Sequence, residues 1–329
     1  MENIVAVIRT LDNYSEIDGA IMRAVELVGG LDSAQKYDRI VIKINLCDLR
    51  ARNAALKQKA SCVKIDRIIV VSSGSRDRTD AIVEDFARRD RRIALIREKE
   101  RRGKASAVNQ IIKATLSDVI VLESADTLPE EDTVERLCHP FADESVGMVG
   151  AHPVPVNDKR TFMGYVHFLL WDLHHHIALR NPKCGEMIAF RRVFNGVPDD
   201  VVCDEAWIEY EVKRKGYKVV YVPDAIVYNK GPETVRDFLK QRRRVTCGHL
   251  DLYGRTGYKV STSDPLLLLS TITNVFPRKE LKKWICFLIF VVLESIGRLL
   301  GYYDYYVVKR KQVIWDVSTS TKELDVKVE

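Results

Sequence analysis

The sequence lacks several features that would assign it to common protein classes. Its seven cysteines are scattered and contain no C-x-x-C pair, which argues against a disulfide framework and against a zinc site. No charged-then-apolar leader opens the chain, because MENIVAVIRT is typical of a short strand. No low-complexity run and no repeat of solenoid period is present. We therefore expect a globular protein whose folded part stays in a reducing cytosol.

Positive charge exceeds negative charge by only six, but it is concentrated in two segments, 88–104 and 236–244. The first segment is interleaved with Glu98 and Glu100, which favours a solvated face. Phosphates or anionic lipid head groups are the alternative partners. No basic stretch interleaved with aromatic residues and no nucleic-acid-binding module is present, so nucleic acid is not an expected partner.

Strand-like and helix-like patterns alternate along the chain. With 329 residues, 46% of them hydrophobic, the chain can bury a large core. Branched apolar runs at 67–71, 93–96, 118–123 and 146–151 alternate with helical spacing, which predicts a mostly parallel sheet with helices on both faces. In the second half we expect helices at 161–180 and 204–217, and strands at 186–192 and 218–228.

The composition changes abruptly after Pro265. The unbroken apolar run Trp284–Leu293 covers ten residues, fewer than the ~20 that span a bilayer, but aromatic residues and lysines flank it as they do at membrane interfaces. We therefore expect residues 266–308 to contact a membrane, either as an interfacial helix or as a single tilted span. A helix buried in the protein core remains an alternative, and Glu294 and Arg298 are spaced to pair on one face.

A strand followed by small residues closes on a carboxylate at 68–77, IIVVSSGSRD. Ser73 and Gly74 allow a sharp turn, and Asp77 can accept hydrogen bonds from a base or a ribose. This arrangement is typical of nucleotide pockets in α/β proteins. An ordinary strand-to-helix turn capped by Asp77 is the alternative.

A second carboxylate, Asp126, follows the predicted strand 118–123 at the carboxyl end of the sheet, where open α/β folds bind ligands. It could hold Mg²⁺ or Mn²⁺, hard ions that take oxygen ligands. Alternatively, Asp126 could cap a helix opened by Thr127 and Pro129.

The acidic pair Asp204 and Glu205 begins a predicted helix, where the positive end of the helix dipole keeps a carboxylate ionised. An ionised carboxylate near a hydroxyl can act as a general base. The alternative is that acidic residues simply favour a helix N-terminus. Further on, Gln241 and Arg244 lie three apart on a basic helix, and a guanidinium there could bind a diphosphate or remain solvated.

Five segments resemble, in the same order, motifs of the inverting family 2 glycosyltransferases, which have the GT-A nucleotide-sugar fold. VVSSGSRDRT is similar to the first nucleotide-binding turn, and RRGKASAVN to the donor-contacting G-K-x-x-A-x-N segment. VLESADT stands where the metal-binding D-x-D stands, DEAWIEYEVKRKG resembles the helix that carries the catalytic base, and QRRRV is similar to Q-x-x-R-W. The resemblance covers about residues 60–250.

The resemblance implies an enzyme that passes a sugar from a nucleotide-diphosphate donor to a hydroxyl acceptor with inversion. Glu205, or alternatively Asp204, would deprotonate the acceptor, and Asp126 would hold a divalent metal ion, Mg²⁺ or Mn²⁺. The residues expected to bind the nucleotide sugar are Ser73, Gly74, Asp77, Lys104, Gln241 and Arg244. We expect a lipid-linked or surface-glycan acceptor, at the cytoplasmic face of the cell membrane.

Three departures from the family pattern qualify this prediction. Ser124 replaces the first aspartate of D-x-D, and Val245 replaces the tryptophan of Q-x-x-R-W. The proline- and asparagine-bearing nucleotide loop is missing before the strand at 68–71, and residues 1–50 resemble the start of an unrelated domain family. A catalytically silent nucleotide-binding or membrane scaffold protein is therefore the alternative.

We expect three parts in the chain. Residues 1–50 would form an N-terminal strand-helix-strand segment, residues 51–260 the GT-A domain, and residues 261–329 a membrane-associated helical tail.

Overall fold

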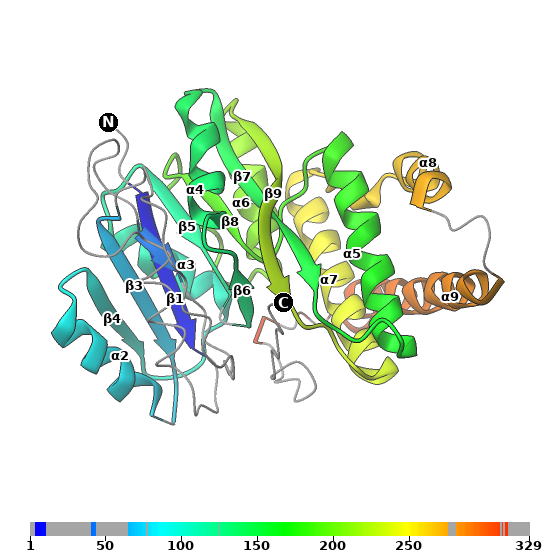
Figure 1. Cartoon of the computed structure of the whole chain (residues 1–329), viewed down its shortest axis with the longest axis horizontal. Coiled ribbons are helices and arrows are strands. Elements are labelled where there is room, and N and C mark those ends of the chain that lie inside the picture. Colours follow the sequence, from blue (N-terminus) through cyan, green and yellow to red (C-terminus); the bar gives the residue numbers. More distant parts are fainter. Residues whose placement is uncertain are drawn as a thin grey trace.

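The computed structural model describes residues 4–10, 41–43, 65–76, 78–124, 126–275, 281–309, 311, 313 and 314. Its centre is a nine-stranded sheet in the order β4-β3-β1-β2-β5-β8-β7-β9-β6 (Figure 1). The strands are β1 (Ile4–Thr10), β2 (Val41–Lys43), β3 (Arg67–Ser73), β4 (Ile93–Glu98), β5 (Val119–Leu122), β6 (Thr127–Pro129), β7 (Val146–Pro155), β8 (Ile188–Arg191) and β9 (Lys218–Asn229).

The sheet is mostly parallel, as the alternating pattern predicts. Strands β1 to β5 pair in parallel, and so do β7 and β9. Strand β8 lies between β5 and β7 and is antiparallel to both, and β6 is antiparallel to β9. Strands β1 and β2 place residues 4–10 and 41–43 in the same sheet, whereas the helix expected between them lies outside the described residues.

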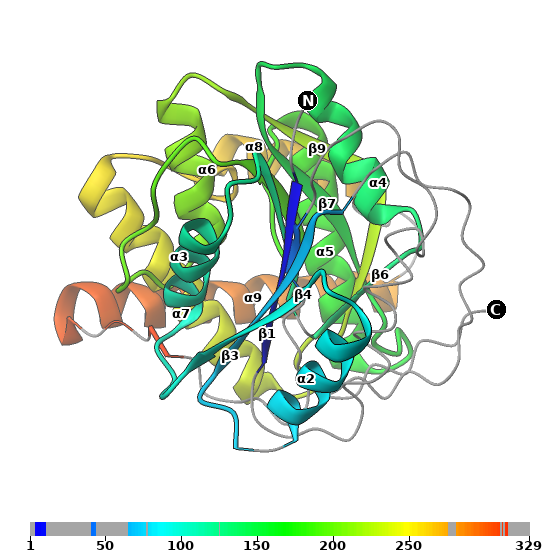
Figure 2. The same cartoon turned by 90° about the vertical axis from the view of Figure 1, so that its left-hand side faces the viewer.

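Helices cover both faces of the sheet. Figure 2 shows α3 (Lys104–Ala114) and α6 (Asp204–Arg214) on one side, and α2 (Thr79–Arg89) and α4 (Thr133–Cys138) on the other. Because both faces are covered, successive residues of a central strand are buried, as in Ile68–Ser73 of β3. Each large apolar side chain buried in this way contributes roughly 1.5–3 kcal/mol to stability.

Four further helices lie on the side of β9 that faces away from β1 to β5 (Figure 1). They are α5 (Phe162–Arg180), α7 (Val235–Thr256), α8 (Pro265–Val275) and α9 (Leu281–Tyr303), and a π-helical stretch, Asp304–Val308, continues α9. Short 3₁₀ turns lie at His139–Ala142 and Ser261–Ser263. Helices α5 and α7 begin at threonine N-caps whose hydroxyls accept hydrogen bonds from Gly164 N and Asp237 N, each bond 3.1 Å long.

Helix α9 packs one face against α7. Two glycines make this possible, because a Cβ at Gly297 would lie 2.6 Å from Arg242 Cβ, and one at Gly301 would lie 2.6 Å from Thr246 Cβ. Phe290 and Leu293 bury their side chains in a small core between α5, α7 and α9. The predicted pairing of Glu294 with Arg298 is present, at 2.8 Å.

The opposite face of α9 is apolar and exposed. Its exposed side chains include Trp284, Ile285, Leu288, Val292, Ile296 and Leu299. Within the described residues, Lys283–Val308 is one helical stretch long and apolar enough to cross a membrane by length and composition. This stretch is longer than the ten-residue apolar run in the sequence, which Glu294 ends. Glu294 and Arg298 interrupt the apolar sequence, but their charges are engaged in ion pairs with each other and with Arg242.

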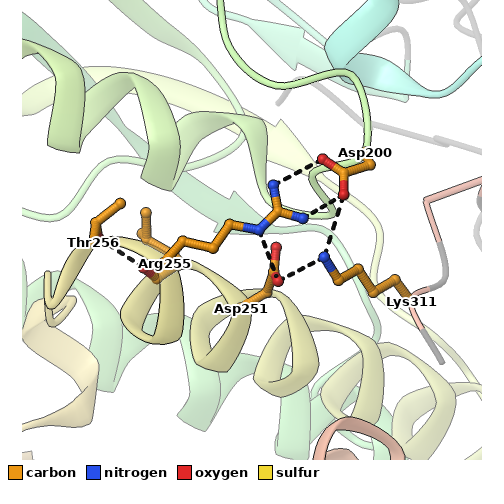
Figure 3. A network of polar contacts seen from close by, with 6 residues as sticks. Asp200, Asp251, Arg255, Thr256 and Lys311 are labelled. Atoms are coloured by element: carbon orange, nitrogen blue, oxygen red, sulfur yellow. Dashed lines mark hydrogen bonds and ion pairs between the residues drawn. The ribbon is translucent and has the colours of Figure 1, made fainter. Parts of the chain in front are cut away.

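A second polar network ties the chain beyond α9 to the folded core (Figure 3). The buried Asp251 of α7 accepts hydrogen bonds from Arg255 Nε at 3.1 Å and from Lys311 Nζ at 2.8 Å. Both cations also contact Asp200, on the segment that leads into α6, and the hydrogen bond from Arg255 holds the pKa of Asp200 below its usual range. These contacts fix the approach to α6, whose first turn carries Asp204 and Glu205.

Candidate active site

A cavity of about 640 Å³ lies between the carboxyl ends of the central strands and the helices α5, α7, α8 and α9. Five of the residues expected from the sequence line it: Lys104, Asp126, Glu205, Gln241 and Arg244. They come from α3, the turn after β5, α6 and α7, so the cavity is where segments distant in sequence converge.

Lys104 is the first residue of α3 and reaches into this cavity. Gly103 precedes it at φ 92°, a left-handed conformation that glycine adopts without strain. Lys104 Nζ donates to Ser124 Oγ at 3.2 Å and lies 3.4 Å from Glu205 Oε1. Burial alone would lower the pKa of Lys104, but the carboxylates around it, of which Glu205 acts most strongly, raise it, so this lysine is charged.

The two members of the acidic pair have different surroundings. Glu205 lines the cavity and pairs with Lys104, whereas Asp204 is buried and lies outside the cavity lining. Both are in the first turn of α6, as the sequence predicts. The ion pair and the helix N-terminus both favour the ionised form of Glu205.

Asp126 lies in the turn after β5 and lines the cavity. Thr127 closes this turn, because its backbone N and its Oγ1 donate to Ser124 O at 3.2 Å and 2.6 Å. The alternative that Asp126 caps a helix is wrong. Residues 127–129 form strand β6 and pair with β9, and α4 begins only at Thr133.

Glu186 is a cavity residue that sequence analysis missed. It comes just before β8, and its backbone has φ 58°, a left-handed value that is unfavourable for a residue with a Cβ. Asn229 Nδ2 donates to Glu186 Oε1 at 3.4 Å. Burial and the neighbouring Asp126 raise the pKa of Glu186 to about 7, although Lys104 acts in the opposite direction.

The three consecutive arginines of α7 all line the cavity, and two of them also pair with the α9 segment. Arg242 and Arg243 pair with Glu294 and Asp304 of the α9 segment. Arg244 and Gln241, one turn apart, line the cavity as expected, and Gln241 Oε1 is buried without a hydrogen-bond partner within the described residues.

The predicted nucleotide turn lies outside the lining of this cavity. Ser73 Oγ donates to the buried carboxylate of Glu98, which also accepts hydrogen bonds from Ser106 Oγ at 2.5 Å and Gln110 Nε2 at 3.0 Å. Gly74 has φ 66°, and a Cβ there would come within 3.0 Å of Arg101 N, so the turn requires glycine. Asp77 lies outside the described residues. The roles of Ser73, Gly74 and Asp77 in donor binding stay predictions.

The far end of the cavity is apolar and carries several buried ring nitrogens. It is lined by side chains from α5, α8 and α9, namely Leu170, Trp171, His174, Ile177, Leu268, Ile272, Phe290 and Val291. Trp171 Nε1 and both ring nitrogens of His167 have no hydrogen-bond partner within the described residues. Burial lowers the pKa of His167 to about 4, so its ring is neutral at pH 7.

The donor atoms near Asp126 suit a hard cation. Within the described ranges, no three His, Cys, Asp or Glu side chains form a group able to hold a metal ion. However, Asp126 and Glu186 supply two carboxylates to one cavity, and Asn229 Oδ1 there is buried without a hydrogen-bond partner within the described residues. An all-oxygen donor set of this kind fits Mg²⁺ or Mn²⁺.

Comparison with solved structures first defines the class of fold. The chain is similar to a mannosyltransferase from Pyrobaculum calidifontis that was solved in complex with GDP-Man and Mn²⁺, with a TM-score of 0.55. The similarity covers 94% of this chain and 90% of that one at 18% sequence identity, so it concerns the fold alone. It confirms the predicted GT-A-like fold.

The family follows from the sequence comparisons. Residues 49–206 match the model of the family described as "Glycosyl transferase family 2", which confirms the resemblance drawn from the motifs. The match includes Lys104, Asp126 and Glu205 and ends before Gln241 and Arg244.

Two curated relatives agree with this assignment. An N-acetylglucosaminyltransferase of Rhizobium meliloti (strain 1021) is 26% identical over 204 residues, 54% of this chain and 47% of the relative. A poly-beta-1,6-N-acetyl-D-glucosamine synthase of Staphylococcus aureus (strain COL) is 25% identical over 190 residues, 54% of this chain and 46% of the relative. The chain thus spans about half the length of the curated relatives it matches.

Proposed function

We propose that this protein transfers a sugar from a nucleoside-diphosphate donor to a hydroxyl acceptor with inversion, assisted by a divalent metal ion. One observation carries the proposal: the ion pair between Lys104 and Glu205 faces the same cavity as Asp126. A carboxylate kept ionised, a buried cation and a second carboxylate are the groups that this reaction requires. The glycosyltransferase names of the relatives are consistent with this reaction.

In the proposed reaction, Glu205 is the general base. Its Oε1 atom is held by Lys104 at 3.4 Å, and its position in the first turn of α6 adds the favourable field of the helix dipole. The acceptor hydroxyl would donate its proton to this carboxylate as the hydroxyl oxygen attacks the sugar. Asp204, in the same first turn of α6, is buried outside the cavity lining and is the alternative base.

The cationic side chains would bind the departing diphosphate. Lys104 and Arg244 bring positive charge to the cavity, where a low dielectric strengthens their attraction for phosphate oxygens. Asp126 would hold Mg²⁺ or Mn²⁺, which when bound supplies further positive charge to the leaving group. The Pyrobaculum mannosyltransferase, solved with GDP-Man and Mn²⁺, is consistent with this cofactor.

The acceptor would be a glycan or a lipid-linked sugar at the cytoplasmic face of the membrane. The cavity supports a lipid-linked acceptor, because it continues from Glu205 to the apolar side chains of α5, α8 and α9, which could contact a lipid chain. Support for the membrane comes from the exposed apolar face of α9, because contiguous apolar surface marks a site of interaction. Since α9 packs its other face on α7, we favour an interfacial helix over a span.

The test is a screen of UDP- and GDP-sugars with Mn²⁺, with release of the nucleoside diphosphate as the readout. We expect sugar-dependent release from the full chain, and we expect Glu205→Gln to lower turnover by about 10²-fold or more with little change in donor affinity. Glu144→Gln, which removes an exposed carboxylate outside the cavity, is the matched control. Donor binding without any release would instead identify a catalytically silent binding protein.

A further inference from the structure

The strand pairing places Glu186 at the same edge of the sheet as Ser124, the residue that replaces the first aspartate of D-x-D. Strands β5 and β8 are antiparallel, with Leu122 opposite Ile188. Ser124 follows Leu122 by two residues and Glu186 precedes Ile188 by two, so both lie just beyond this end of the paired strands. Lys104, whose Nζ donates to Ser124 Oγ at 3.2 Å, lines the same cavity as Glu186. Glu186 can therefore deliver its carboxylate to the region that Ser124 leaves without one.

The backbone of Glu186 is strained while its side chain faces the cavity. Its φ of 58° is left-handed, and within the described residues only Lys309 shares this feature among residues other than glycine. Such a conformation is unfavourable for a residue with a Cβ. A residue kept in this conformation at a cavity wall is typical of functional sites, where strain persists because the surroundings impose it.

Asn229 supplies a third oxygen to the same place. It ends β9 and lies opposite Thr127, the residue that follows Asp126. Its side chain is 5% exposed and directs Nδ2 toward Glu186 Oε1, at 3.4 Å. Its Oδ1 atom has no hydrogen-bond partner within the described residues, and leaving a buried carbonyl oxygen unpaired has a desolvation cost. A bound ligand would remove this cost.

From these contacts we infer that Asp126, Glu186 and Asn229 together bind the divalent cation, with Glu186 providing the carboxylate that Ser124 cannot. The inference rests on the proposed function, because the cation would serve the nucleoside diphosphate. Two carboxylates and an amide oxygen form a donor set that hard cations prefer. The nucleotide and water would complete the coordination, since Mg²⁺ and Mn²⁺ commonly keep several ligands of this kind.

The test is a titration of the full chain with Mn²⁺, alone and with UDP or GDP, in which free Mn²⁺ is measured by electron paramagnetic resonance. We expect Glu186→Gln to weaken Mn²⁺ binding by about tenfold or more, and Asn229→Ala to weaken it less. Glu130→Gln is the control, because Glu130 is a nearby carboxylate that accepts a hydrogen bond from Tyr228 and does not line the cavity. Undiminished Mn²⁺ binding by Glu186→Gln would overturn the inference.

A change of metal preference tests direct coordination of the cation by Glu186. Because the affinities for two metals are compared on the same variant, the test still works if the variant is partly destabilised. Glu186→Cys places a soft sulfur where a hard oxygen stood, so its preference should shift from Mn²⁺ toward Cd²⁺ relative to the unmodified chain. An unchanged preference would contradict direct coordination by this side chain. If Mn²⁺ binds as expected but no donor is turned over, the proposed function fails and the metal site stands. If donors are turned over and Glu186→Gln still binds Mn²⁺ normally, the metal site fails and the function stands.

Discussion

Replacing Glu294 by glutamine should remove the charge that joins α9 to α7. The Glu294 carboxylate accepts hydrogen bonds from Arg242 Nε at 2.6 Å and Nη2 at 2.7 Å, and from Arg298 Nε at 2.8 Å. The Arg242 and Glu294 side chains are only 15% and 14% exposed. The substitution would leave the Arg242 guanidinium buried without its carboxylate.

The expected cost follows from the electrostatics of this site. Burial by itself would raise the pKa of Glu294, but Arg242 and Arg298 lower it from the usual 4.5 to about 2. At about 1.4 kcal/mol for each pKa unit, the ionised form is favoured by about 3 kcal/mol in the folded chain. Removing one member of a buried ion pair costs about 3–5 kcal/mol, which agrees. Because the folded-state pKa is depressed, this contribution is present above pH 4.5 and is lost as the pH falls toward 2.

The measurement is the free energy of unfolding at pH 7, from urea titration followed by tryptophan fluorescence. We expect Glu294→Gln to lower it by about 3 kcal/mol. Glu84→Gln breaks an ion pair with Arg97 in which both side chains are 48% exposed, and should cost less than about 1 kcal/mol. Equal effects of the two substitutions would refute the claim that the α7–α9 ion pair is buried and structurally important.

Three further outcomes are expected. The pKa of His167 is lowered from 6.5 to about 4, so the unfolded chain binds a proton at this residue at higher pH than the folded chain, and the fall in unfolding free energy from pH 7 to pH 5 should be smaller by about 2 kcal/mol in His167→Leu than in the unmodified chain. Gly301→Ala should cost about 1–3 kcal/mol because its Cβ would meet Thr246, whereas Gly185→Ala has open space and should cost little. Leu288→Glu, on the exposed face of α9, should weaken sedimentation of the full chain with anionic vesicles and leave the unfolding free energy nearly unchanged.

The sheet and its covering helices could be predicted because their signals are local. The continuous branched run at 67–71 indicates a strand buried on both faces, and β3 forms there. The helical spacing after Gly103 indicates a helix with one buried face, and α3 forms there. Lys104, Asp126 and Glu205 each follow or begin such an element, so their convergence at one edge follows from the parallel order of the strands.

Glu186 could not be found in the same way, because its place depends on pairing between distant segments. Strand β8 enters the sheet antiparallel between β5 and β7, and no local pattern indicates that order. The left-handed backbone of Glu186 has no signature either, since a glutamate rarely adopts it. The one available sign was a carboxylate two residues before a strand that is apolar at three of its four positions, IAFR.

The three arginines of α7 explain why a basic cluster in a sequence is ambiguous. Successive residues of a helix point about 100° apart, so Arg242, Arg243 and Arg244 cannot share one partner. All three line the cavity, and Arg242 and Arg243 also form ion pairs with carboxylates of the α9 segment. One helix therefore carries both the contacts that hold the apolar helix and a cation of the candidate site. Helix α7 consequently joins the proposed donor site to α9, which carries the proposed membrane-facing surface.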